Sequence, residues 1–133
     1  MERETFDLIE RYMLRCMDDA AHDREHVYRV LYLAMDIARY EEADTGLLIA
    51  ACLLHDVGRK EQMENPSLDH AVVGAEKARR FLLEEGFDPA FAGRVSACIA
   101  THRYRSDHPP ESIEAKILFD ADKLDVTGAM GAA

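Results

Sequence analysis

Hydrophobic side chains recur every three or four positions along most of the chain, which is the spacing of one face of an α-helix. Ile9 and Met13 show this spacing in the first segment, and Val30 and Ala34 show it in the second. The pattern predicts six helices, over residues 4–19, 24–40, 45–58, 67–85 and 88–102, and from 111 through 122.

Turn-forming and capping residues separate these segments. Asp44 or Thr45 is expected to cap the third helix and Ser67 the fourth, because short polar side chains accept hydrogen bonds from the free N–H groups of a first turn. Gly86 is expected to end the fourth helix, and Pro89 suits the first turn of the fifth. The remaining polar stretches, 61–67 and 103–110, are expected to be loops.

No segment alternates hydrophobic and polar residues as a half-buried strand would. The chain is therefore expected to be all-α, a compact helical bundle of about six helices. Its 133 residues carry no repeat, low-complexity tract or interdomain linker, so one domain over 1–133 is expected. The final residues lack a helix stop signal, which is typical of a chain that ends before its natural C-terminus.

Four polar side chains fall on the hydrophobic stripes of these helices, and so are expected to face the core. They are His26, His55, His102 and Asp122. Any one of these histidines on its own is more often a hydrogen-bonded core residue, and an aspartate can be a cap or a salt-bridge partner. The alternatives remain open for each residue taken singly.

The adjacent pair His55-Asp56 changes that balance. It follows the apolar run 47–54, which would carry an imidazole and a carboxylate into the interior together. Burial of both without a partner is costly, and a cation shared with another inward aspartate removes much of that cost. Helix bundles build metal sites from side chains on facing helices in this way.

Composition restricts the partners and the compartment. The chain has 16 basic and 26 acidic residues and a net charge of −10, which argues against binding duplex nucleic acid but leaves room for a small phosphorylated substrate. Its three cysteines are far apart, as is typical of reduced thiols in a cytosolic protein. With no signal peptide and no apolar run long enough to span a bilayer, a cytoplasmic protein without a membrane association is expected.

The order of these motifs resembles the HD-domain superfamily of metal-dependent phosphohydrolases, in particular its small bacterial members. The signature of that superfamily is a His, then a His-Asp doublet, then an Asp, all on helices of one bundle. In this chain those positions are His26, the doublet His55-Asp56, and Asp122 within Asp-Ala-Asp-Lys-Leu. The resemblance implies that these four residues bind a divalent metal ion and that Asp56 also orients the attacking water.

Six further residues are candidates for supporting roles. The resemblance implies a second metal or a phosphate at His70 and His102, which could also protonate the leaving oxygen; a structural core role stays open for both. Arg59 and Lys123 lie beside ligand positions and could neutralise phosphate, or be exposed charges. Asp23 and Asp125 could support a ligand histidine, or be surface or capping residues.

Two imidazoles and two carboxylates suit a divalent ion of intermediate hardness. Mn²⁺ is the first expectation, with Fe²⁺, Co²⁺, Ni²⁺, Mg²⁺ and Zn²⁺ open. The expected activity is hydrolysis of a phosphoester or phosphoanhydride bond in a nucleotide or another small phosphorylated substrate. The absence of a His-His pair and of Gly-Tyr-Pro argues against the branch that cleaves cyclic dinucleotides. Three alternatives stay open: a non-catalytic nucleotide-binding regulator, a di-iron oxygenase, and an inert interaction domain.

Overall fold

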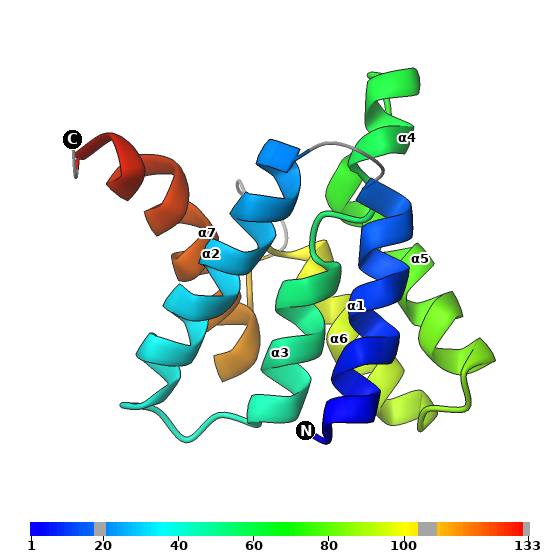
Figure 1. The fold of residues 1–133 in the computed structure, drawn as a ribbon, viewed down its shortest axis with the longest axis horizontal. Helices are drawn as coiled ribbons and strands as arrows, with labels where there is room; N and C mark the ends of the chain where they lie inside the picture. Colours follow the sequence, from blue (N-terminus) through cyan, green and yellow to red (C-terminus); the bar gives the residue numbers. More distant parts are fainter. Residues whose placement is uncertain (18–20, 104–108, 132–133) are drawn as a thin grey trace.

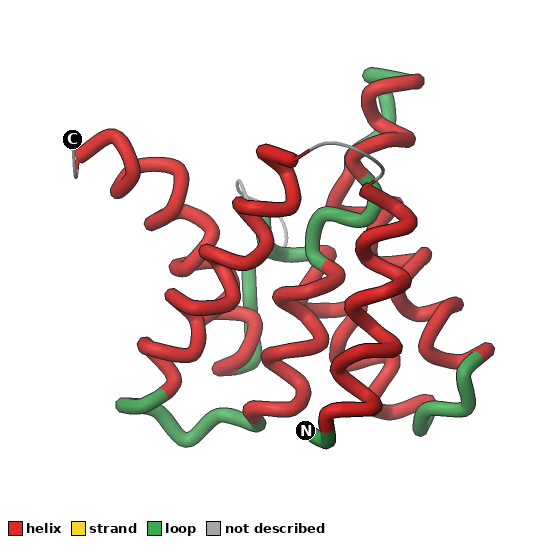
Figure 2. Tube along the Cα trace, viewed as in Figure 1, coloured by secondary structure: helices red, strands yellow, loops and turns green. Residues whose placement is uncertain are grey.

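Seven helices make up the secondary structure of the computed structural model, which describes residues 1–17, 21–103 and 109–131. No strand occurs among these residues (Figure 2), so the expected all-α bundle is confirmed. The helices are α1 (Arg3–Met17), α2 (Ala21–Ala38), α3 (Thr45–Leu54), α4 (Arg59–Glu64), α5 (His70–Glu84), α6 (Pro89–Ala100) and α7 (Ile113–Gly131).

Helix α3 forms the centre of the bundle, because most of its length is buried and apolar on every side. Its buried residues are Leu47, Leu48, Ala50, Ala51, Cys52, Leu53 and Leu54. A helix without a polar face has to be covered all round. In Figure 1, α1 and α2 flank α3 in the front layer, and α5, α6 and α7 lie behind them. The C-terminal end of α3 is therefore buried inside the bundle.

The helix boundaries confirm part of the expected pattern and correct part of it. Asp44 caps α3 through a 3.1 Å hydrogen bond from the Leu47 N–H, and Gly86, with φ +86°, lies just after α5. The third helix ends at Leu54 rather than Gly58, and Asp69 rather than Ser67 caps α5. The stop at Leu54 matters most, because it places the His-Asp doublet in the turn that follows the helix.

Helix α4 lies where the sequence pattern predicted a loop. It has six residues, none of them buried, and so lacks the hydrophobic stripe by which a helix is recognised. Figure 1 shows it at the edge of the bundle, beyond the end of α1. Among the described residues, no helix is both long enough and apolar enough to cross a membrane.

Candidate metal centre

The turn after α3 carries the His-Asp doublet into the interior. His55 has no exposed surface and Asp56 has 2% exposed, so both side chains are removed from bulk water. The turn packs against α5 backbone to backbone at Gly58 and Gly74. Lys77 of α5 donates a 3.0 Å hydrogen bond to the Val57 carbonyl and fixes the turn from the same side.

Four of the predicted residues meet in one group, which we call the first group: His26, His55, Asp56 and Asp122. The Nε2 atoms of His26 and His55 lie 3.4 Å apart. Asp122 Oδ1 lies 2.8 Å from the former and 3.5 Å from the latter, and Asp56 Oδ2 lies 3.7 and 3.6 Å from the same two atoms. Ligands bound at about 2.1 Å to one divalent ion lie roughly 3 Å apart, so this donor set fits such an ion with small adjustments.

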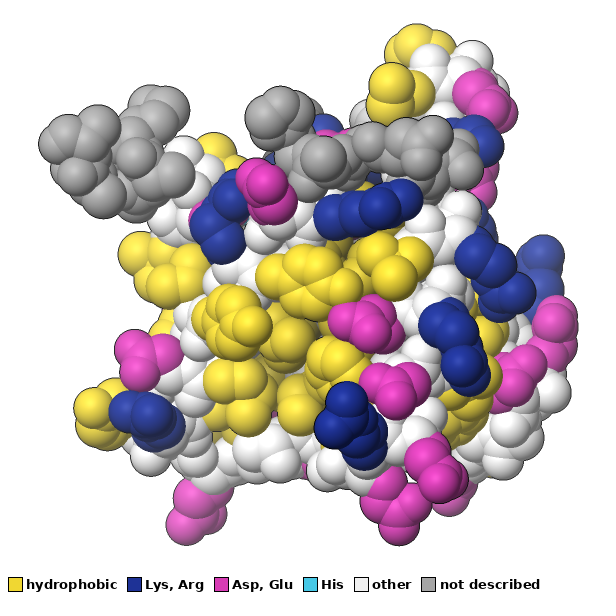
Figure 3. Space-filling model, viewed as in Figure 1, with side chains coloured by type: hydrophobic (Ala, Val, Ile, Leu, Met, Phe, Trp, Pro, Cys, Tyr) yellow, Lys and Arg dark blue, Asp and Glu magenta, His cyan; other side chains and the backbone are white. Residues whose placement is uncertain are grey.

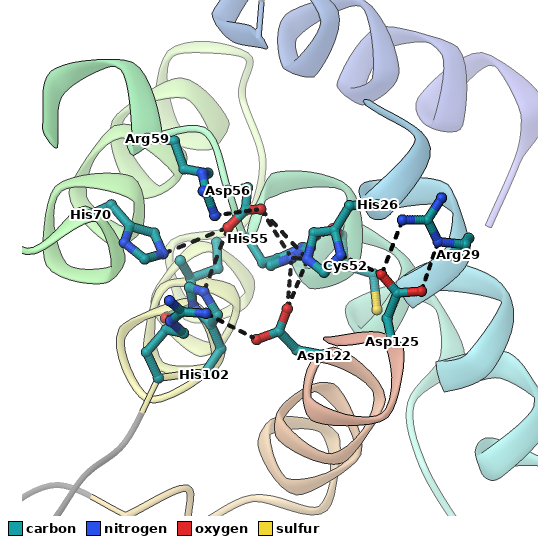
Figure 4. Close-up of polar contacts among 12 residues, drawn as sticks. His26, Arg29, Cys52, His55, Asp56, Arg59, His70, His102, Asp122 and Asp125 are labelled. Carbon is teal, nitrogen blue, oxygen red and sulfur yellow. Dashed lines mark hydrogen bonds and ion pairs between the residues drawn. The ribbon is translucent and has the colours of Figure 1, made fainter. Parts of the chain in front are cut away.

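A second group shares Asp56 with the first. It consists of Asp56, His70 and His102, with Asp56 Oδ1 lying 3.7 Å from Nε2 of each histidine. Both of these Nε2 atoms and Asp56 Oδ2 are buried and have no hydrogen-bond partner. Buried polar atoms are rarely left unpartnered. The second group therefore also has the donor chemistry of a cation or phosphate site (Figure 4).

All four imidazoles of the two groups point the same ring nitrogen inward. In each of them Nδ1 lies 2.6 Å from an oxygen acceptor outside the cluster, which makes Nδ1 a donor, so that Nε2 carries the lone pair whenever the ring is neutral. For His26, His55, His70 and His102 in turn, the acceptors are Asp125 Oδ2, the Cys52 carbonyl, Gln62 Oε1 and the Ile99 carbonyl. This arrangement fixes ring orientation and tautomer as in known metal-binding histidines.

Burial and nearby opposite charges have opposing effects on the pKa values of the titrating groups in the centre. Burial alone would lower the pKa of His55, but the carboxylates of Asp56 and Asp122 outweigh it and raise that pKa to about 9. The reciprocal attraction overcomes burial at both aspartates and holds their pKa values well below the ordinary range. At His70 burial prevails and lowers the pKa to about 4, so this ring is neutral at pH 7.

Cationic side chains border the centre on two sides. Arg59 Nη1 lies 3.8 Å from Asp56 Oδ2, and Arg103 Nη1 lies 3.9 Å from Asp122. Arg103 and Lys123 also line an open pocket of about 370 Å³ that reaches Asp122. Both arginine side chains are about two-fifths exposed, so they can contact a solute as well as the centre.

The two aspartates considered for supporting roles lie in different places. Asp125 accepts the Nδ1–H of His26 and also accepts a 2.7 Å hydrogen bond from Nε of Arg29, which lies across it in Figure 4. Asp23 instead lines a separate groove between the ends of α1, α2 and α4, together with Arg59. The structure gives Asp23 no contact with a histidine of either group.

Two residues near the centre were not identified from the sequence. Arg103 directly follows His102, and this adjacency was a usable signal for it. Gln62 lies in the stretch expected to be a loop, and nothing in the local pattern marks it. The face in Figure 3 shows no exposed histidine among the described residues, in keeping with the inward placement of these rings.

The all-α fold agrees with the family comparison. Residues 24–127 match the HD domain family, and the chain belongs to that family. This match covers all the residues of both groups.

Solved and curated relatives support the same grouping. A crystal structure of a predicted HD superfamily hydrolase from an uncultured Thermotogales bacterium is 39% identical, with a TM-score of 0.74, over 96% of this chain and 72% of that chain. A tRNA (cytidine(56)-2'-O)-methyltransferase from Thermoplasma volcanium is 33% identical over 74% of this chain, and a ribonuclease Y from Chloroflexus aurantiacus is 31% identical over 75%. The chain spans only 30% and 18% of the lengths of these two proteins.

Proposed function

We propose that the protein is a metal-dependent phosphohydrolase that acts on a nucleotide or another small phosphorylated substrate. The observation that carries the proposal is the pair of donor groups sharing Asp56, with every imidazole Nε2 turned inward. The net charge of −10 disfavours duplex nucleic acid as the partner. The similarity to ribonuclease Y makes a phosphodiester a second bond type to include in assays.

His26, His55, Asp56 and Asp122 would hold the essential ion. Mixed imidazole and carboxylate donors suit Mn²⁺ well, with Fe²⁺, Co²⁺, Ni²⁺, Mg²⁺ and Zn²⁺ as further candidates. A divalent ion there supplies Lewis acidity, which lowers the pKa of water and polarises a phosphoryl oxygen. Asp56 is assigned the additional role of orienting the attacking water, because it has one oxygen directed to each group.

The other residues near the centre are assigned to a second ion, to the substrate phosphate and to the support of the ligands. His70 and His102 would hold a second ion or the phosphate itself, and a neutral His70 accepts rather than donates a proton at pH 7. Arg59 and Lys123 from the sequence analysis, together with Arg103, would offset phosphate charge. Asp125 would hold the His26 ring in its orientation by accepting the Nδ1–H. Asp23 would act at most at the edge of the site.

A di-iron oxygenase is the second candidate, because the second group offers donors for another ion beside the first. The two candidates differ in whether the active protein requires a coupled pair of iron ions. Anaerobic loading with iron followed by Mössbauer spectroscopy would reveal a coupled iron pair in an oxygenase. Phosphate release with Mn²⁺ and without O₂ favours the hydrolase.

The test combines elemental analysis of untreated protein with a panel of nucleotides, phosphomonoesters and phosphodiesters in added Mn²⁺. The double variant His55→Ala/Asp56→Ala should lose both bound metal and turnover, while Asp120→Ala, an exposed aspartate on α7, should retain both. Wild-type turnover by the double variant would refute the proposal. Nucleotide binding without turnover, across several metals, would instead indicate a regulatory domain.

A further inference from the structure

The four inward histidines differ in what holds their Nδ1 atoms. His55 and His102 each follow the end of a helix, and each ring donates to the backbone carbonyl three residues earlier in its own chain segment. His70 is the first residue of α5. No helical turn precedes it, so no carbonyl of its own helix is available. Its Nδ1 donates instead to Gln62 Oε1 on α4, at 2.6 Å.

Helix α4 is held in place by polar contacts rather than by burial. It has no buried residue, and Glu61 pairs with Lys77 at 2.7 Å. The same Lys77 ammonium donates to the Val57 carbonyl in the doublet turn. Gln62 and Glu61 are thereby fixed relative to both α5 and the turn that carries Asp56.

We propose that Gln62 is the positioning residue that keeps the second group open for a divalent cation. By accepting the Nδ1–H of His70, it keeps the lone pair on Nε2, facing Asp56 Oδ1. This inference rests on the proposed metal centre, but it concerns the second group alone. The two imidazoles of the first group have acceptors of their own, Asp125 and the Cys52 carbonyl, and neither of these lies on α4.

The competing state explains why an acceptor matters. His70 Nε2 is buried without a partner, 3.7 Å from Asp56 Oδ1. Without Gln62, the ring proton gains by moving to Nε2, from which a small rotation lets it donate to the carboxylate. That hydrogen bond would give the buried Nε2 atom a partner and occupy the cation's place. Gln62 therefore favours the open form by giving the proton a better position.

The test compares Gln62→Leu, which removes the acceptor, with Gln62→Glu, which keeps one, and with Glu64→Gln, an exposed change on the same helix. Long-range ¹H–¹⁵N NMR of the metal-free protein reports the tautomer of each imidazole. Titration calorimetry with Mn²⁺ reports the number of ions and their affinities. Urea unfolding of each variant checks that the fold is intact.

We expect the wild type to show His70 protonated on Nδ1 and to bind two Mn²⁺ ions. Gln62→Leu should move that proton to Nε2 and weaken the second ion about 10- to 100-fold, with the first ion unchanged. Gln62→Glu should keep the proton on Nδ1 and bind the second ion at least as tightly as the wild type, and Glu64→Gln should resemble the wild type.

An unchanged His70 tautomer in Gln62→Leu, equal loss of both ions, or a single Mn²⁺ in the wild type would overturn the inference. Two bound ions without any phosphoester turnover would count against the proposed function alone.

Discussion

Replacing Gly58 by alanine tests how tightly the doublet turn is packed against α5. A Cβ at this position would overlap the His70 carbonyl oxygen and lie 2.6 Å from the Gly74 nitrogen. Both are backbone atoms, so neither can rotate away as a side chain would. The backbone of Gly58 has φ −94° and ψ 0°, which alanine also adopts, so the cost is purely steric.

The expected magnitude follows from two opposing effects. Overpacking a well-packed site costs about 1–3 kcal/mol. Replacing glycine by alanine, where the backbone angles suit alanine, stabilises the fold by about 0.4–1 kcal/mol, because the unfolded chain has less conformational freedom to lose. We therefore expect Gly58→Ala to lower the free energy of unfolding by about 1–2 kcal/mol, or the Tm by about 4–7 °C for a chain of this size.

The chain contains its own control. Gly93 lies inside α6, and a Cβ there would meet nothing within 4 Å. Gly93→Ala should raise stability by about 0.5–1 kcal/mol through helix propensity. Thermal unfolding of both variants and of the wild type, in excess chelator, gives the comparison. If Gly58→Ala is as stable as the wild type, the turn does not approach α5 as closely as these backbone distances indicate.

Three further predictions concern the first group. Because the pKa of His55 is raised to about 9, its proton competes with a metal ion. The affinity for Mn²⁺ should therefore rise about tenfold per pH unit from pH 6.5 towards 9. Calorimetry that shows no proton release on binding would contradict this. In the same window the metal-free protein should lose stability as pH rises, since the folded state binds the extra proton. Asp125→Ala should weaken Mn²⁺ about 10- to 100-fold by releasing Nδ1 of His26, measured against a chelating dye.

Hydrophobic spacing was sufficient to predict the bundle and the inward face of its key residues. His26 and Asp122 lie on stripes of long helices, where a period of 3.6 determines direction over several turns. The doublet followed from a different signal, an apolar run that ends in two polar residues. Each of these patterns extends over several positions, so an error at one position changes the predicted direction of the helix face little.

Short-range features of the centre were not predictable in the same way. His70 is the first residue of its helix and has no stripe to define its direction, so only the family resemblance indicated it. Gln62 belongs to a six-residue helix with no buried position, for which periodicity carries no information. Asp125 and Asp23 looked equivalent in sequence, and only tertiary packing separates them.

The centre must keep buried carboxylates balanced by positive charge in every state. Arg29 does this for Asp125 through the 2.7 Å contact at its Nε. For Asp56 and Asp122, the proton on His55 supplies balancing charge without an ion, beside Arg59 and Arg103, and the two carboxylates raise the pKa of that imidazole. A divalent ion in the first group would replace this proton, so proton and metal would occupy the centre alternately. Metal content after purification should therefore depend on buffer pH, and protein purified near pH 6 should need added Mn²⁺ for full turnover.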